Sequence, residues 1–198
     1  MKLHSIAGAA ALLLLAASSQ AAVVFTDGFD ASVSGLNVVP TGWTVTDGTV
    51  DVVSGGFCQS GLCVDLDGST GDAGVLSRSF DLTGGVAYTL SFDISGNKRG
   101  GIDDVVVLFG SASRTFEDLA AATPYATATL DFTPGASGSF AISFANSGGD
   151  NIGALLDNVS ISSAVAAPIP EPETYALMLL GLGAIGAAAR RRRNETAA

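Results

Sequence analysis

The stretch VAYTLSFDI, residues 86–94, alternates between apolar and polar side chains. Its apolar positions are Tyr88, Leu90, Phe92 and Ile94, and polar side chains stand between them. Successive side chains of a β-strand point to opposite faces of the sheet. The stretch therefore predicts a strand with one buried face and one polar face.

The same alternation returns in SFAISFA, residues 139–145, and shorter apolar runs between turn residues occur along the chain. These runs are VDVV (50–53), LCVDLD (62–67), VLSRSF (75–80), DVVVLFG (104–110), YATATLDF (125–132) and LLDNVSIS (155–162). About nine or ten strands at a spacing of roughly 10–14 residues are typical of an all-β sandwich. One piece looks helical, FEDLAAA at 116–122, and we expect it to form a single turn or a loop.

The N-terminus has the layout of a secretory signal peptide. Lys2 precedes an apolar run from Ile6 to Ala17, and Ser19 and Ala21 have the spacing of a small-residue cleavage site. We therefore assign residues 1–21 to a signal peptide and expect the rest of the chain to be exported.

The C-terminus has a different pattern. Residues 174–189 contain no charge and no proline, and Arg190, Arg191, Arg192 and Arg193 follow them. As a helix this stretch would span about 24 Å, which is short against the ~20 residues that a bilayer needs. Arginine stems can relieve part of that mismatch, and arginine clusters stay on the cytoplasmic side. We interpret 174–189 as a membrane helix with a cytoplasmic C-terminus.

Pro170, Glu171 and Pro172, the apolar stretch and the arginine cluster together resemble the PEP-CTERM sorting signal, here residues 170–193. Such a segment is also called an ice-binding-protein C-terminal motif, a label that does not imply ice binding. The resemblance implies an envelope protein of a Gram-negative bacterium that is handled by an exosortase, a peptidase of the inner membrane. Transient anchoring there, then release to the cell surface or the exopolysaccharide and biofilm matrix, is the implied route.

Between the two ends we expect one domain, residues 22–162, and a linker, residues 163–169. Residues 22–167 contain sixteen acidic side chains against four basic ones, a balance of −12. Such a body repels nucleic acid and suits cations or neutral partners such as glycans. All but one of its acidic residues are Asp, which favours turns over helices.

Cys58 and Cys63 are the only cysteines, and an exported pair this close is expected to form a disulfide. Metal binding or redox chemistry by the two thiols is the alternative. The one histidine, His4, lies in the signal peptide, so the exported part has no Ser-His-Asp site and no histidine-bound zinc. Carboxylate pairs such as Asp103 with Asp104, or Asp65 with Asp67, leave a glycosidase as an alternative to the expected non-enzymatic protein.

The first and last strands of the body carry candidate calcium ligands. Calcium prefers several oxygen ligands at about 2.4 Å. Asp27 or Asp30 near the beginning and Asp157 near the end would meet if the terminal strands are neighbours. The sequence thus offers a structural calcium site, with ordinary turn residues as the alternative and no other cofactor expected.

A second resemblance covers GWTVTDGTVDVVSGGF (42–57), residues 64–100 and LDNVSIS (156–162). These stretches look like exported proteins of the DUF642 or choice-of-anchor type, which implies a galactose-binding-like jelly roll. Trp43 and Phe57 are then candidate sugar platforms, unless both are buried. The loop of Asn97, Lys98 and Arg99 offers polar contacts or is a solvated turn. Two functions follow: glycan binding in the exopolysaccharide layer, or a structural, adhesive matrix protein stabilised by calcium.

Overall fold

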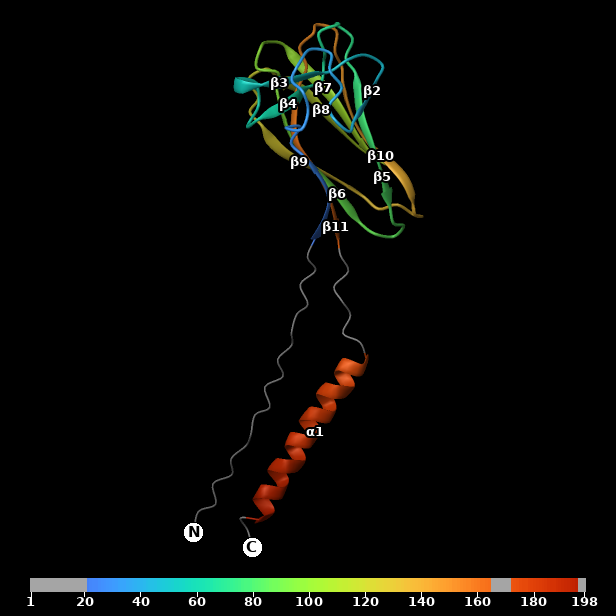
Figure 1. Ribbon diagram of the computed structural model, residues 1–198, viewed down its shortest axis with the longest axis vertical. Helices are drawn as coiled ribbons and strands as arrows, with labels where there is room; N and C mark the ends of the chain where they lie inside the picture. Colours follow the sequence, from blue (N-terminus) through green and yellow to red (C-terminus); the bar gives the residue numbers. More distant parts are fainter. Residues whose placement is uncertain (1–20, 165–171, 196–198) are drawn as a thin grey trace. The chain divides into compact units, whose positions relative to one another are not determined.

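A computed structural model describes residues 21–164, which form a β-sandwich, and residues 172–195, which form a helix (Figure 1). Residues 1–20, 165–171 and 196–198 lie outside the described ranges, and with them the predicted signal peptide and most of the predicted linker. The strands are β1 (Ala21–Asp27), β2 (Thr44–Thr46), β3 (Asp51–Ser54), β4 (Leu62–Asp65), β5 (Val75–Leu82), β6 (Tyr88–Ser95), β7 (Ile102–Phe109), β8 (Ala112–Ala120), β9 (Ala126–Phe132), β10 (Gly138–Asn146) and β11 (Leu155–Ala164). A short 3-10 turn, η1, covers Gly55–Phe57.

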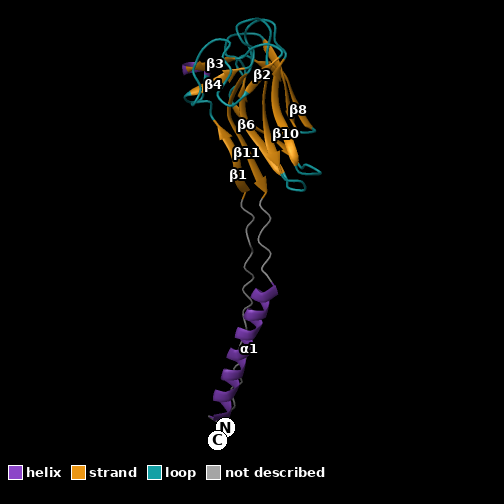
Figure 2. Ribbon diagram, turned by 45° about the vertical axis from the view of Figure 1, so that its right-hand side comes forward, coloured by secondary structure: helices purple, strands orange, loops and turns teal. Residues whose placement is uncertain are grey.

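The strands form two antiparallel sheets that face one another (Figure 2). The first has the order β3-β4-β11-β6-β9, with β1 also paired to β11, and the second has the order β2-β5-β10-β7-β8. The predicted all-β, jelly-roll-like sandwich is confirmed. In β6 the four alternating apolar side chains are buried, as the pattern of residues 86–94 predicts.

The piece at 116–122 is not a turn or a loop, which corrects the sequence-based expectation. Its first five residues belong to β8, where Phe116 pairs with Val105 and Leu119 pairs with Asp103. A shift in register between these two pairs keeps both apolar side chains half-buried against the core. The irregular spacing that resembled a helix is thus that of a bulged strand.

Trp43 belongs to the core, so it is not a sugar platform. Its side chain is 7% exposed, and its ring centre lies 5.6 Å from that of Phe29 and 6.2 Å from that of Phe144. Its indole Nε1 donates a 2.8 Å hydrogen bond to Asp27 Oδ2. A buried tryptophan needs a partner for this donor, and Asp27 provides it.

The second described range forms one helix, α1 (Pro172–Glu195). Among residues 21–164 and 172–195, no helix is long and apolar enough to cross a membrane. The membrane helix predicted over residues 174–189 does not meet this requirement. Its uncharged stretch is shorter than a bilayer requires, and glycine and alanine give much of it little apolar surface.

Candidate functional site

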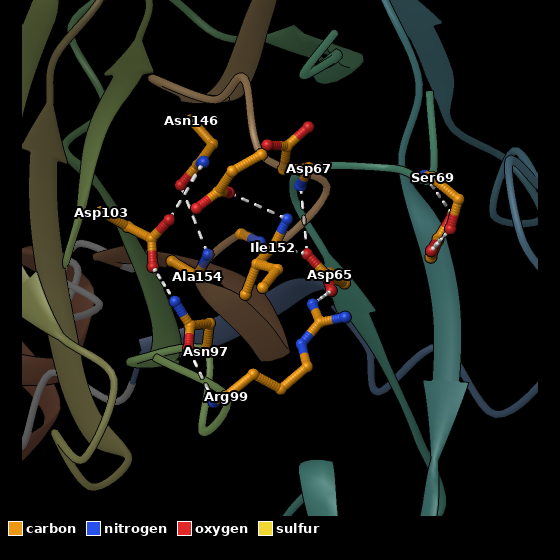
Figure 3. Close-up of polar contacts among 12 residues, drawn as sticks. Asp65, Asp67, Ser69, Asn97, Arg99, Asp103, Asn146, Ile152 and Ala154 are labelled. Carbon is orange, nitrogen blue, oxygen red and sulfur yellow. Dashed lines mark hydrogen bonds and ion pairs between the residues drawn. The ribbon is translucent and has the colours of Figure 1, made fainter. Parts of the chain in front are cut away.

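A buried polar network fixes the loop between β6 and β7 (Figure 3). Asn97 is 1% exposed, and its side-chain nitrogen donates to Gly100 O and to Asp103 Oδ2, both at 2.8 Å. Its side-chain oxygen accepts hydrogen bonds from the backbone N–H groups of Arg99 and Gly100. The side-chain amide of Asn97 thus forms hydrogen bonds within the loop and with β7, and it is buried rather than directed to a ligand.

The network continues from Asp103 to the strands beneath the loop. Asp103 Oδ1 accepts a 3.4 Å hydrogen bond from Asn146, whose oxygen accepts one from the backbone of Ala154. Burial raises the pKa of Asp103, the two asparagines oppose this, and the charges of Asp150 and Asp67 add to it. Four separate chain segments are held together in this way.

Asp65 and Arg99 form an ion pair beside this network (Figure 3). Asp65 is 1% exposed, and its Oδ1 accepts hydrogen bonds from the backbone of Asp67 at 3.1 Å and of Gly153 at 2.8 Å. Burial raises the pKa of Asp65 to about 7, although Arg99 and the two amides favour the charged form. The Arg99 side chain remains 32% exposed, so it binds Asp65 below and reaches the surface.

Lys98 joins the loop to its neighbours. Its backbone has φ +60°, which is uncommon for a lysine, and its N–H donates to Ala121 O at 2.9 Å. Its Nζ donates to the backbone oxygen of Phe57 at 2.9 Å and lies 4.7 Å from the ring centre of Tyr125. Both the backbone and the ammonium group of the exposed Lys98 are therefore held by contacts with neighbouring segments.

A hollow of about 350 Å³ opens at this loop, lined by Lys98, Arg99, Gly100, Ala121 and Ala122. Two of these residues are basic and none is acidic, within a body whose charge balance is −12. The other three lining residues, one glycine and two alanines, have small side chains or none.

The disulfide loop, residues 55–63, contacts Lys98 and Arg99, the two basic residues that line the hollow. Cys58 and Cys63 are bonded, with their Cα atoms 5.4 Å apart, as predicted. Phe57 is half-buried, and its ring centre lies 5.6 Å from the guanidinium carbon of Arg99. Its backbone oxygen also accepts a 3.1 Å hydrogen bond from the hydroxyl of Tyr125. Phe57, the remaining predicted platform, thus stands next to the basic loop.

The second sheet offers no exposed aromatic side chain, among the described residues, on which a sugar ring could stack. Within the described residues, the aromatic side chains of the sheet containing β5, β7, β8 and β10 are all buried in the core or packed against it. They are Phe80, Phe109, Phe116, Phe140 and Phe144. Beside the hollow, by contrast, the half-buried Phe57 and Tyr125 lie next to the basic side chains of Arg99 and Lys98.

The three predicted calcium ligands separate into two groups. Both oxygens of Asp27 accept hydrogen bonds, from the backbone of Phe29 and from Trp43, which places this carboxylate in a structural role. Asp30 and Asp157 both approach Gly28, where a Cβ would lie 4.0 and 3.9 Å from one oxygen of each. Within the described parts of the chain, no three Asp, Glu, His or Cys residues are placed to hold a metal ion together.

Asp157 keeps an unusual environment all the same. Its Oδ1 accepts a hydrogen bond from the backbone of Asn158, and its Oδ2 is buried without a partner among the described residues. Burial raises the pKa of Asp157 to about 6, against the Asn158 hydrogen bond, and the nearby charges of Asp93 and Asp30 raise it further. A positive group at this place would stabilise the charged form of Asp157 in the folded protein.

The C-terminal segment shows how the protein is delivered. Residues 168–193 match the PEP-CTERM protein-sorting motif. This match confirms the resemblance seen in the sequence, and it marks an exported protein that is sorted to the cell surface. Pro170 and Glu171 lie outside the described residues, whereas Pro172 begins α1 and the four arginines fall near its end.

Solved structures resemble the sandwich. The CBM22-1 xylan-binding domain of Paenibacillus barcinonensis Xyn10C matches with a TM-score of 0.52 and 14% identity, over 76% of this chain and 100% of that domain. The CBM22-1–GH10 modules of Clostridium thermocellum xylanase 10B, solved with xylohexaose, match with a TM-score of 0.50 and 14% identity, over 74% of this chain and 29% of that one. No curated protein matches the chain in sequence. At this identity the likeness establishes the fold.

Sequence reasoning found the parts of this site but not its organisation. The sequence indicates Phe57, the disulfide and the polar loop of residues 97–99. The central position of Asn97 and the partnership of Lys98 with Tyr125 were missed, because both depend on contacts between distant segments. Two adjacent basic residues in an acidic body, flanked by glycines, were the available signal.

Proposed function

We propose that this chain is a non-enzymatic, exosortase-processed surface protein that binds glycan at the hollow beside the β6–β7 loop. The observation that carries the proposal is a hollow on a prearranged loop that Lys98 and Arg99 line. The side chains of these two residues also contact Tyr125 and Phe57. Ligand sites usually combine apolar or aromatic surface with a few fixed polar groups. Fixing those groups before binding reduces the entropy lost on binding.

The fold supports the same proposal. One of the similar solved structures is a xylan-binding domain, and another contains modules in complex with xylohexaose. The sorting motif adds a location at which glycans are plentiful, because the resemblance links such proteins to exopolysaccharide.

Three of the four carboxylates considered for glycoside hydrolysis, Asp65, Asp103 and Asp104, are not placed together at a cleft. Asp65 is buried and paired with Arg99, and Asp103 is buried and bonded to two asparagines. Asp104 points to the opposite, exposed face of β7. None of these carboxylates lines the hollow, which supports binding without catalysis.

The test is binding of the full chain to exopolysaccharide extracted from the source bacterium. A ligand that binds only the folded state raises the unfolding temperature by mass action. We expect a rise with polysaccharide, and a smaller rise in a Phe57→Ala variant. An unchanged unfolding temperature and no measurable binding would overturn the proposal.

The second candidate function is a structural matrix protein stabilised by calcium, and the unpaired buried Oδ2 of Asp157 favours it. Asp30 and Asp157 would supply carboxylate oxygens, with backbone carbonyls completing the set. The measurement is the unfolding temperature with calcium and with a chelator. A stabilisation that survives in Asp157→Asn would contradict this assignment.

A further inference from the structure

The hollow carries a charge opposite to that of the body around it. We propose that it receives the anionic group of an acidic sugar, the carboxylate of a uronic acid unit in a polysaccharide. This inference rests on the proposed glycan binding and specifies the class of glycan.

The distribution of basic residues is the first argument. Residues 22–167 contain four of them, and Lys98 and Arg99 both line this hollow. The other two lie over aromatic rings elsewhere: the guanidinium carbon of Arg78 is 4.4 Å from the ring centre of Phe25, and that of Arg114 is 4.6 Å from that of Phe116. Half of the basic residues of the body thus line one hollow.

The unused hydrogen-bond donors are the second argument. The Lys98 ammonium has three N–H donors, of which two meet the backbone oxygens of Gly56 and Phe57. The Arg99 guanidinium has five, and among the described residues its side-chain partner is Asp65 through Nη2. The remaining donors suit a carboxylate, whose two oxygens match the fork of an arginine.

The rigidity of the loop is the third argument. Asn97 holds the backbone of Arg99 and Gly100 from inside, and Lys98 is fixed by Ala121 and by the disulfide loop. Cations held in place lose little side-chain entropy when an anion binds. The size also fits, because ligand pockets begin at about 300 Å³.

The acidic body does not prevent this binding. At physiological salt, exposed charges are screened beyond about 8 Å, so distant carboxylates oppose an anion in the hollow only weakly. The same carboxylates disfavour attachment of an acidic polymer elsewhere on the surface. The hollow is thereby a selective place for an anionic unit.

The experiment compares matched ligands on the full chain by calorimetry. Short oligosaccharides of galacturonate, glucuronate and mannuronate are set against their neutral counterparts of galactose, glucose and mannose. A sulfated oligosaccharide distinguishes a carboxylate from another anion. We expect at least one uronate to bind about threefold to fivefold tighter than its neutral counterpart, the size of one partly exposed ion pair.

Two variants change the charge of the hollow with little strain. Lys98→Asn removes the cation, and asparagine tolerates a positive φ better than most residues. Ala122→Glu places a carboxylate in the exposed lining. Arg114→Gln, on β8, is the control with the same change in net charge as Lys98→Asn. Both hollow variants should remove the preference for the uronate, and the control should keep it.

The possible outcomes distinguish a failure of the acidic-sugar proposal from a failure of glycan binding itself. Equal affinity for acidic and neutral sugars, unchanged in both hollow variants, would overturn the acidic-sugar proposal and leave glycan binding intact. Absence of binding to every sugar would overturn both. An equal loss in Arg114→Gln would show a general charge effect and would also overturn it. Sulfate binding that both hollow variants abolish would support the hollow as an anion site for either group.

Discussion

Lys98 and Tyr125 donate hydrogen bonds to the same acceptor, the backbone oxygen of Phe57, at 2.9 and 3.1 Å. The ammonium of Lys98 also lies 4.7 Å from the ring centre of Tyr125. Three segments that are distant in the sequence thus meet at one carbonyl group. The disulfide loop and the basic loop, residues 97–100, are therefore connected. A substitution that moves one loop should also move the other.

Removal of the Asn97 side chain should release the basic loop. Asn97→Ala deletes two donated and two accepted hydrogen bonds and leaves buried Asp103 with one partner fewer. We expect a loss of about 2 kcal/mol in the free energy of unfolding and weaker glycan binding. Urea denaturation measures the first and calorimetry the second. Full retention of both would contradict the role assigned to Asn97.

Arg99→Met should leave Asp65 buried without its ion-pair partner. Breaking a buried pair in this way costs about 3 kcal/mol, because the remaining charge is uncompensated. The pKa of Asp65 would rise further, so the destabilisation should be larger at pH 8 than at pH 5. Urea denaturation at the two pH values tests this. Combining Arg99→Met with Asp65→Asn should restore part of the loss at pH 8.

The free energy of unfolding should fall as the pH rises from about 4 to 7. Folding raises the pKa of Asp157 to about 6 and that of Asp65 to about 7, so the folded protein binds more protons than the unfolded chain in this range. Stability then decreases with increasing pH. In Asp157→Asn the decline between pH 4 and 6 should become shallower. A rise in stability over this range would refute the assignment.

Gly153 should not tolerate a side chain. A Cβ on this residue would overlap the backbone nitrogen of Asp67 and lie 2.8 Å from Asp65 Oδ1. Gly153→Ala should cost about 2 kcal/mol by overpacking the network. Gly135→Ala is the matched control, since a Cβ there meets nothing within 4 Å. Thermal unfolding of both variants tests the difference between them.

Processing at the sorting motif has its own test. Replacing Pro170, Glu171 and Pro172 by alanine should leave the chain uncut by the exosortase. Mass spectrometry of the protein recovered from the cell envelope and from the medium would identify the C-terminus. A variant that is cut at the same place as the native chain would show that these residues are not required.

The strands were predictable because each carries its own alternating pattern, as residues 86–94 do for β6. The bulge in β8 was not, since the register shift beside Asp103 depends on the partner strand. Trp43 illustrates a similar limit. The sequence does not show that Trp43 lies in the core and that its indole nitrogen donates a hydrogen bond to Asp27. The contacts of Asn97 and Lys98 with distant segments could not be predicted either. The sequence shows only that both residues lie in a loop flanked by glycines.

The pairing of β11 with β6 has a mechanical consequence. Ser95 pairs with Leu155 and Tyr88 with Ser163, so the basic loop after β6 lies at the end of β11 opposite to Ala164. A load between a polymer bound at this loop and a tether beyond Ala164 would therefore run along the strands. Hydrogen bonds of an antiparallel pair are perpendicular to the strands, so such a pull shears all of them at once. Under such a load the β6–β11 pair would resist tension along this axis rather than unzip.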